Sequence, residues 1–168
     1  MKTVSLGGKK AAGRVALVDD EDYDLVAGYR WCLWEPPGKR RPGGPYAAAN
    51  IKLPDGRCTA ILMHKMLTGW RQTDHIDHDG LNNQRSNLRP ATQAQNAYNA
   101  RPTLGTSSQY KGVSWHKTAG KWMAQIAYGR KNRYLGLFLS EEAAAAAYDD
   151  AARQLGGEYA FLNFPDVA

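Results

Sequence analysis

Three short β-like segments followed by one helix end the chain, and this order restricts its C-terminal part to a small sheet that carries a helix. Ser140 suits the N-cap of that helix, two glutamates occupy its first turn, and Gly156 and Gly157 follow its expected end. Small residues share one helical face, which lets the helix lie close on a sheet. The expected strands span residues 110–116, 121–128 and 133–138.

The same region is basic. Residues 105–135 contain six basic residues and no acidic one, with Trp115, Trp122 and Tyr134 among them. The whole chain has a net charge of +6 and a pI near 9.4, which favours a polyanionic partner. The alternative is a basic surface that is only solvated. The absence of acidic residues and the presence of interleaved aromatic residues favour nucleic acid as the partner. Trp122 itself is expected in the core. The basic residues are Lys111, Lys117, Lys121, Arg130, Lys131 and Arg133.

The N-terminal part alternates short apolar runs with turns, which predicts a β-rich subdomain. Its expected strands cover residues 14–18, 29–34, 46–51 and 60–64. A Pro/Gly-rich basic stretch at 36–45 contains too many breakers for a regular element. The acidic run 19–24 suits either a hard cation or the start of a short helix, and the helix dipole favours the second reading.

Composition places the chain among ordinary globular proteins. Its 168 residues and 43% apolar content suit one medium domain or two small ones. Pro102, Gly105 and the serines beside them predict a linker over residues 102–109. No apolar stretch has the length of a membrane span or a signal peptide core, so we expect the protein to stay in the cytoplasm.

The two cysteines, Cys32 and Cys58, form no Cys-x-x-Cys pair. Such pairs hold the structural zinc of many small protein modules, so no structural zinc is expected here. Both cysteines are expected to be core thiols.

The richest chemistry begins at Asp74 and His75, which are followed by Asn87 and Asn96. Phosphodiester hydrolysis needs a base that activates water and a divalent cation that neutralises charge on the leaving oxygen. His75 can be the base and Asp74 a metal ligand. Because adjacent residues of a strand point to opposite faces, both serve only if the strand end bends or the ligand reaches round.

Local signals surround this pair. Asp79-Gly80 predicts a tight turn that folds the chain back as a hairpin. Thr92 with Gln95 reads as a capping box, so a short helix is expected to begin at residue 93 and to place Asn96 in its first turn. Two strands, a turn and a short helix are therefore expected to converge on His75.

This order of residues resembles the HNH (ββα-metal) endonucleases, particularly the phage and group I intron homing branch, over roughly residues 60–100. The run from Asn83 to Arg89 resembles the signature of that branch. The resemblance implies that His75 is the general base, that Asp74 and Asn96 bind one Mg²⁺ or Mn²⁺, and that Asn87 orients the imidazole. The chain departs from the branch at Asp77-His78-Asp79, which adds either a metal ligand or a polar turn, the turn being favoured. His64 stays open between a core histidine and a contact near the site.

Residues 108–166 resemble the plant APETALA-two/ethylene-response-factor DNA-binding domain, whose three-stranded sheet lies in the major groove. The motifs that carry the likeness include Tyr110-Lys111-Gly112-Val113, Tyr134-Leu135-Gly136 and Leu162-Asn163-Phe164. Several positions that carry Arg or Trp in plants are replaced here, so the plant target sequence is not transferred. Arg133 is a further candidate DNA contact. The likeness places on the DNA side Lys111, Ser114, His116, Lys121, Gln125, Ala127, Asn132 and Tyr134.

The sequence therefore predicts an α+β protein: an HNH nuclease region at 1–101, a linker at 102–109, and a DNA-binding domain at 110–166. The expected function is metal-dependent hydrolysis of duplex DNA, with the C-terminal domain supplying the address and the protein acting as a monomer. Lys65, Arg85 and Arg89 are candidate phosphate contacts. A non-catalytic DNA-binding regulator is the alternative, and action on RNA is disfavoured because the C-terminal domain resembles a duplex reader.

Overall fold

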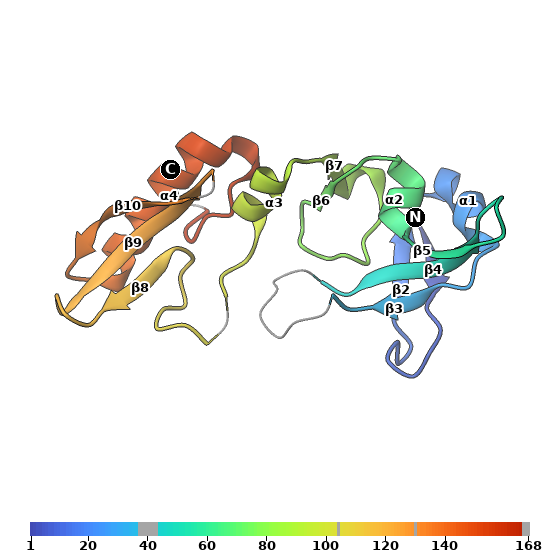
Figure 1. The fold of residues 1–168 in the computed structure, drawn as a ribbon, viewed down its shortest axis with the longest axis horizontal. Coiled ribbons are helices and arrows are strands. Elements are labelled where there is room, and N and C mark those ends of the chain that lie inside the picture. The colour runs from blue at the N-terminus through green and yellow to red at the C-terminus, as the bar shows by residue number, and fades with distance from the viewer. Residues whose placement is uncertain (37–43, 104, 130, 166–168) are drawn as a thin grey trace. The chain divides into compact units, whose positions relative to one another are not determined.

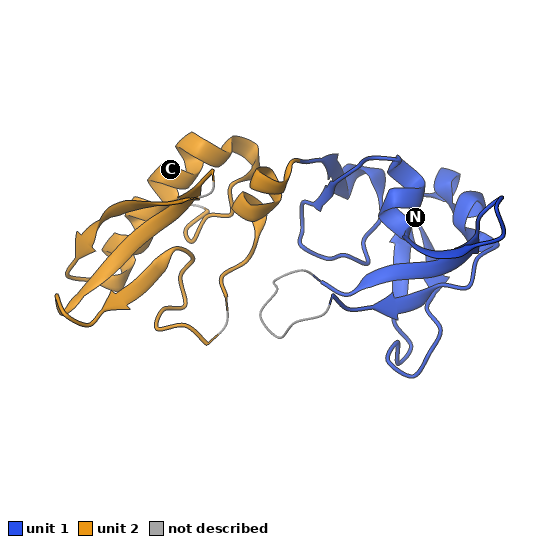
Figure 2. Cartoon of the chain, in the orientation of Figure 1, with its two compact units in different colours: residues 1–38, 43–91 blue, residues 39–42, 92–168 orange. Residues whose placement is uncertain are grey.

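The computed structural model describes residues 1–36, 44–103, 105–129 and 131–165, and the chain forms two compact units (Figure 2). Unit 1 comprises residues 1–38 and 43–91, and unit 2 comprises residues 39–42 and 92–168. The breaker-rich stretch predicted at 36–45 lies mostly outside the described residues. Arg130 also lies outside them.

Unit 1 is built of short antiparallel sheets with short helices between them (Figure 1). Strand β1 pairs with β2, β4 lies between β3 and β5, and β6 pairs with β7. Its elements are β1 Lys2–Ser5, β2 Val15–Val18, η1 Asp20–Asp22, α1 Tyr23–Ala27, β3 Cys32–Trp34, β4 Tyr46–Lys52, β5 Cys58–Leu62, α2 Met63–Thr68, β6 Thr73–His75, η2 Arg85–Asn87 and β7 Leu88–Pro90.

The core of unit 1 gathers residues from the sheets, α1 and α2. Val18, Val26 and Met63 are fully buried in it, and Trp31 packs against them while its indole Nε1 donates to the Val26 carbonyl over 2.8 Å. Apolar burial of this kind contributes roughly 25 cal/mol per Å². The acidic run begins a short helix as predicted, because η1 lies within the run and α1 begins before its end.

Two expectations for unit 1 are wrong. The strand predicted at 60–64 ends at Leu62, and Met63 and His64 begin helix α2, which stops at Gly69 with a left-handed φ of 65°. A short apolar run fits a strand or a buried helical turn equally well, so its sequence does not separate them. Cys32 and Cys58 are exposed, since both stand on outward positions of the β3-β4-β5 sheet.

Unit 2 contains the predicted three-stranded antiparallel sheet with one long helix packed on it (Figure 1). The strand order is β10-β9-β8, and helix α4 contacts all three strands. Val113, Ala124 and Ala145 form one part of its core, and Ile126, Tyr148 and Ala152 form the other. Its elements are α3 Gln93–Asn99, β8 Val113–His116, β9 Lys121–Tyr128, β10 Lys131–Phe138, α4 Glu141–Gly156 and η3 Gly157–Tyr159.

The predicted helix caps are confirmed. Thr92 Oγ1 accepts a hydrogen bond from the Gln95 amide, and the Gln95 side chain accepts one from the Thr92 amide, so α3 begins at Gln93. Ser140 Oγ accepts from the Ala143 amide over 3.1 Å and begins α4. Trp122 is partly buried against the core, as expected.

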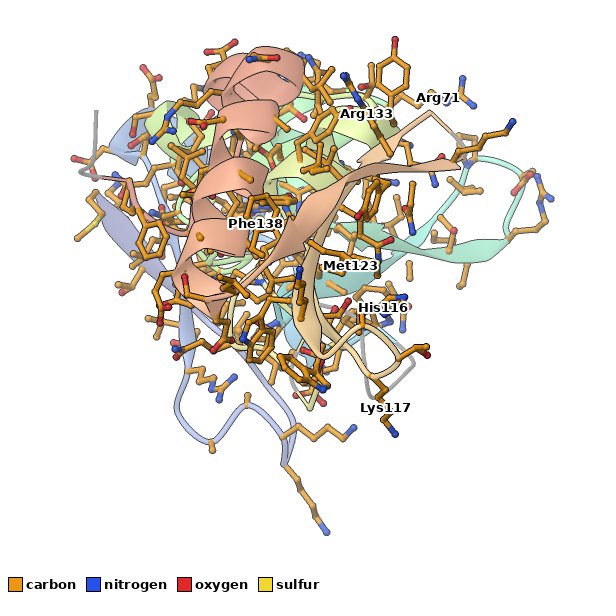
Figure 3. All side chains as sticks on the ribbon, turned by 90° about the vertical axis from the view of Figure 1, so that its left-hand side faces the viewer. Arg71, His116, Lys117, Met123, Arg133 and Phe138 are labelled. Carbon is orange, nitrogen blue, oxygen red and sulfur yellow. The ribbon has the colours of Figure 1, made fainter. Side chains whose placement is uncertain are left out.

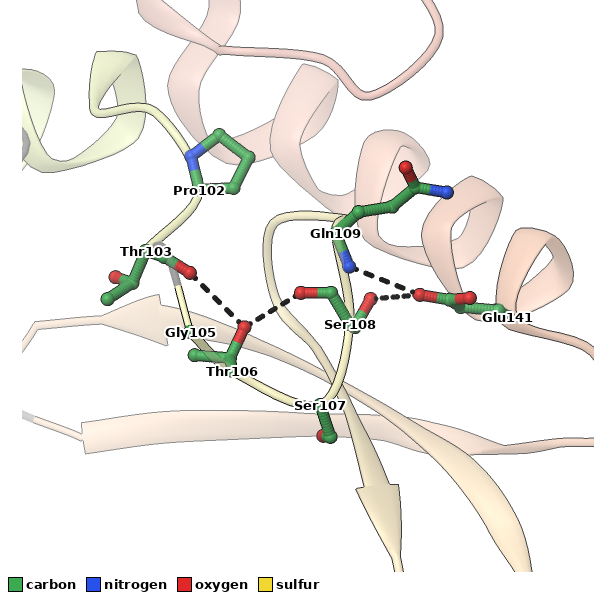
Figure 4. Close-up of a pocket in the computed structure, with 8 residues that line it drawn as sticks. All are labelled: Pro102, Thr103, Gly105, Thr106, Ser107, Ser108, Gln109 and Glu141. Atoms are coloured by element: carbon green, nitrogen blue, oxygen red, sulfur yellow. Dashed lines mark hydrogen bonds between the residues drawn. The ribbon is translucent and has the colours of Figure 1, made fainter.

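The segment predicted as a linker is tied to α4. A hollow of about 430 Å³ is lined by residues of this segment and by Glu141 (Figure 4). Ser108 Oγ donates to Glu141 Oε1 over 2.6 Å, and the Gln109 amide donates to the same oxygen over 3.3 Å. The polar groups of the hollow hydrogen-bond to one another. These contacts hold in place the segment that leads into β8.

The units divide after Ala91, earlier in the chain than the predicted boundary, so α3 belongs to unit 2. Strands β6 and β7 form an antiparallel pair in unit 1, and the ββα module that would join them to α3 stays a prediction. Among the described residues, no helix is long and apolar enough to cross a membrane.

Gly112 tests the close packing of β8 on α4. Its φ of +76° is left-handed, and a Cβ there would collide with the Tyr148 ring. Gly112→Ala should therefore destabilise unit 2 by about 2 kcal/mol more than Gly120→Ala, which has a similar φ of +59° but nothing within 4 Å of the added atom. Hydrogen exchange of β9 amides measures both variants, and equal losses would contradict the packing argument.

Candidate active site and nucleic-acid interface

Asp74 and His75 are the last two residues of β6, which pairs with β7. Both side chains are buried, with 6% and 7% of their surface exposed. Asp74 pairs in register with Arg89, whose Nε and one terminal nitrogen each lie 2.8 Å from Asp74 Oδ2. A carboxylate buried to this extent needs a compensating charge, and Arg89 supplies it. The two residues face different neighbours, as strand alternation requires.

His75 lies in a cluster of three rings. Its imidazole centroid is 5.0 Å from that of His64 on α2, in an edge-on arrangement, and 5.7 Å from the ring of Tyr46 on β4. Tyr46 and His64 also meet edge-on at 5.4 Å. Gly80 lies against the Tyr46 ring, leaving no space for a side chain. The cluster therefore fixes the plane of the His75 imidazole by packing.

Burial keeps both histidines neutral. It lowers the pKa of His64 to about 3, with further lowering by the charges of His75 and Lys65. Burial also lowers the pKa of His75, although Asp77, Asp74, a hydrogen bond with Asn83 and Asp79 oppose the shift. Burial and the charge of Asp74 raise the pKa of Tyr46. His75 is therefore in its proton-accepting form at neutral pH.

The Asn87 side chain braces the loop after His75. Its Oδ1 accepts from the Asp77 amide over 3.0 Å, and its Nδ2 donates to Asp77 Oδ1 over 2.9 Å and to the Asn82 carbonyl over 2.8 Å. Orientation of the imidazole by Asn87 stays a prediction, because these bonds act on the loop. The Asn83 side chain lies beside His75 and opposes the lowering of its pKa.

Residues 77–79 form a polar turn. The amide of Asp79 and the side chain of Asn82 each donate to an Asp77 carboxylate oxygen over 2.8 Å. His78 adopts a left-handed φ of 64°, which folds the chain back. The same loop docks on β2, because the Asn83 amide donates to the Leu17 carbonyl over 2.8 Å.

The acidic run holds the other side of this loop. Asp19 accepts from the Arg85 amide over 2.8 Å and from Gln84 over 3.0 Å, and these bonds lower its pKa. Asp22, only 2% exposed, pairs with the Arg85 guanidinium over 2.8 Å. Arg85 and Arg89 are thus both engaged with carboxylates, whereas Lys65, the third candidate phosphate contact, is exposed on α2.

The two predicted metal ligands belong to different units, Asp74 to unit 1 and Asn96 to unit 2. No cluster of three or more His, Cys, Asp or Glu side chains suitable for a metal occurs in the described parts of the chain. The Asn96 Oδ1 atom is buried and has no hydrogen-bond partner among the described residues. A carboxylate and an unsatisfied amide oxygen are hard donors that suit Mg²⁺ or Mn²⁺.

The sheet of unit 2 presents most of the predicted DNA contacts on one face. The register pairs His116 with Lys121 and Tyr134 with Gln125, and paired residues share a face. Ala124 and Ile126 point the opposite way and are buried under α4. In Figure 3, Phe138 lies on the α4 side of the strands, while His116 and Met123 lie on the other side. The open face carries Ser114, His116, Lys121, Gln125, Ala127, Asn132 and Tyr134.

Arg133 and Lys111 lie elsewhere. Arg133 pairs with Ile126 and therefore stands on the α4 side of the sheet, although it is exposed. Burial lowers the pKa of Lys111 to about 8, and its ammonium donates to the Ala97 and Tyr98 carbonyls over 3.0 and 2.6 Å. DNA contact by these two residues stays a prediction.

Sequence reasoning missed Tyr46 and Asn83 and left His64 undecided. Tyr46 stands in a predicted strand, and no spacing in the sequence links it to His75. Asn83 stands at the start of the 83–89 signature, which was its one available signal. Packing alone brings these side chains to His75.

Comparison with known proteins adds two findings. Residues 108–158 match the AP2 domain. An uncharacterized HNH endonuclease of Acanthamoeba polyphaga mimivirus is 32% identical over 154 residues, which cover 92% of this chain and 77% of that protein. No solved structure matches the chain.

Plant transcription factors match the C-terminal part alone. Dehydration-responsive element-binding protein 2E of Oryza sativa subsp. japonica is 42% identical over 79 residues, covering 42% of this chain and 24% of that protein. An AP2-like ethylene-responsive transcription factor of Arabidopsis thaliana is 47% identical over 60 residues, covering 34% of this chain and 11% of that protein. The chain thus spans a quarter or less of these plant proteins.

Acid should destabilise unit 1 through its buried histidines. The pKa of His64 is lowered on folding, so its contribution to stability is complete above about pH 6.5 and is lost as the pH falls towards 3. His64→Phe should flatten the dependence of the unfolding free energy on pH by up to about 1.4 kcal/mol per pH unit. Hydrogen exchange of unit 1 amides between pH 7 and 4 measures this slope. His116→Phe, in unit 2, is the control, and an unchanged slope in His64→Phe would contradict the assignment.

Proposed function

Since this chain belongs to the HNH endonuclease family and carries an AP2 domain, we propose that it is a metal-dependent endonuclease of the homing type, which hydrolyses a phosphodiester bond of duplex DNA. The AP2 domain implies DNA binding, and the open face of its sheet is the proposed reading surface. The observation that carries the catalytic part is the neutral, buried His75 directly beside Asp74.

In the proposed reaction, His75 accepts a proton from a water molecule whose oxygen attacks phosphorus. The bond from phosphorus to the 3′ oxygen breaks, and the 3′ oxygen departs. A neutral imidazole is the required starting state, and burial supplies it. Packing by His64 and Tyr46 holds the ring plane, which reduces the loss of orientational freedom on reaching the transition state.

Asp74 and Asn96 would hold the divalent cation, which when bound supplies charge neutralisation at the leaving oxygen. Their oxygen donors favour Mg²⁺ or Mn²⁺ over thiophilic metals. Arg89 neutralises Asp74, so metal binding has to compete with this ion pair. Arg85 and Arg89 form ion pairs with carboxylates, whereas Lys65, exposed on α2, forms none among the described ion pairs. Lys65 is therefore the candidate phosphate contact that is available for DNA.

The Asp74–Arg89 pair also favours a second candidate, a non-catalytic DNA-binding regulator in which the motif is structural. In that case the pair stabilises unit 1 and the AP2 domain alone carries the function. Cleavage of duplex DNA by the purified chain, assayed with a randomised library and sequencing of the ends, separates the two.

His75→Ala should reduce cleavage by about 10²- to 10⁴-fold and leave duplex affinity nearly unchanged, because the base acts on water rather than on binding. Single-turnover cleavage and a filter-binding assay measure the two effects. His78→Asn, in the same loop, is the matched control, since asparagine suits its left-handed φ of 64°. Undiminished turnover in His75→Ala would remove His75 from the mechanism.

Chelation should separate binding from chemistry. With EDTA the chain should bind duplex DNA without cutting it, and Mg²⁺ or Mn²⁺ should restore cleavage. Asn96→Ala should raise the Mn²⁺ concentration needed for half-maximal activity about tenfold or more, because one oxygen donor is lost. Cleavage that persists in EDTA would exclude the metal-dependent mechanism.

A further inference from the structure

Helix α3 is part of the core of unit 2. The Tyr98 ring packs with Ile126, Tyr148 and Ala152. A Cβ on Gly156 would come within 3.1 Å of Tyr98, so glycine at the end of α4 lets the two helices approach. The Phe161 amide donates to the Tyr98 carbonyl over 2.9 Å. The AP2 domain therefore packs against a helix that lies outside the matched residues 108–158.

Lys111 supplies the polar contacts between the AP2 domain and α3. Its ammonium bonds to the carbonyls of Ala97 and Tyr98, which lie in the last turn of α3 and lack helical partners. A positive charge at a helix C-terminus is favourable, and this ammonium is partly buried there. The ammonium also lies 5.6 Å from the Phe161 ring and 5.9 Å from the Tyr148 ring.

The backbone of Lys111 is itself held in place. Its amide donates to Asn163 Oδ1 over 2.8 Å, and its carbonyl accepts from Asn163 Nδ2 over 3.2 Å. Asp149, 1% exposed, binds both the backbone and the side-chain nitrogen of Asn163. Hydrogen bonds thus connect α4, the C-terminal segment and Lys111 to the end of α3.

Helix α3 carries Asn96, whose buried Oδ1 has no hydrogen-bond partner in the described residues. We propose that Lys111 is a positioning residue of the nuclease: from within the AP2 domain it anchors α3 and thereby places the Asn96 oxygen donor. This inference rests on the proposed function.

The test compares Lys111→Met, which keeps the length and apolar character of the stem but removes the donors, with Lys111→Arg, which restores charge and donors. Three quantities are measured on the full chain: hydrogen exchange of α3 amides, Mn²⁺ affinity by electron paramagnetic resonance, and duplex affinity in EDTA. Lys121→Met, on the open face of the sheet, is the matched control.

Lys111→Met should speed exchange in α3 but not in β9 and should weaken Mn²⁺ binding by about tenfold. Lys111→Arg should recover much of the Mn²⁺ affinity. Lys121→Met should show the reverse pattern, with weaker duplex binding and unchanged Mn²⁺ affinity. Normal α3 exchange and normal Mn²⁺ affinity in Lys111→Met would overturn the inference.

Two further outcomes are distinguishable. If β9 also loses protection in Lys111→Met, the unit has unfolded, and the same comparison is made with Lys111→Gln, which retains one donor group. If the wild-type chain neither binds Mn²⁺ nor cuts DNA, the proposed function fails, and the role of Lys111 in placing a metal ligand falls with it.

Discussion

Burial of Asp74 and His75 on one short strand is the constraint on which unit 1 depends. Both side chains are more than nine-tenths buried, which is costly for groups that carry or acquire charge. Arg89 offsets the cost for Asp74 by an ion pair, and neutrality offsets it for His75. The β6–β7 pair, α2 and β4 must be folded before the Asp74–Arg89 ion pair and the buried environment of His75 exist. The protonation state of the candidate base therefore depends on the folding of unit 1.

The loop between β6 and β7 shows how the same polar residues serve structure and site together. Asp77 and Asn87 bond to each other and to Asn82, while Asp19 and Asp22 hold Arg85 from the N-terminal segment. The acidic run and the 83–89 signature, far apart in the chain, therefore form a single polar assembly. Residues that read as separate motifs in the sequence stabilise one loop, and that loop carries Asn83 to His75.

Much of the local structure was readable from the chain because local forces determine it. The Thr92 capping box, the Ser140 N-cap and strand β9 stand where the sequence predicts them, since each depends on residues within one turn or one strand. Helix α2 was missed because Met63 and His64 follow a strand without a capping signal. The exposure of Cys32 and Cys58 and the hydrogen bonds of residues 108–109 to Glu141 depend on which neighbours pack beside them, which no local pattern contains.

The sequence by itself determined the family, the AP2 sheet with its helix, and the identity of the candidate base and ligands, because these rest on residue type and spacing along the chain. Tertiary structure decided what surrounds them: the His64 and Tyr46 rings against His75, the pairing of Asp74 with Arg89, and the capture of α3 by Lys111. The physical reason is that burial, and the pKa shifts and hydrogen bonds that follow from it, arises only when segments distant in sequence come into contact.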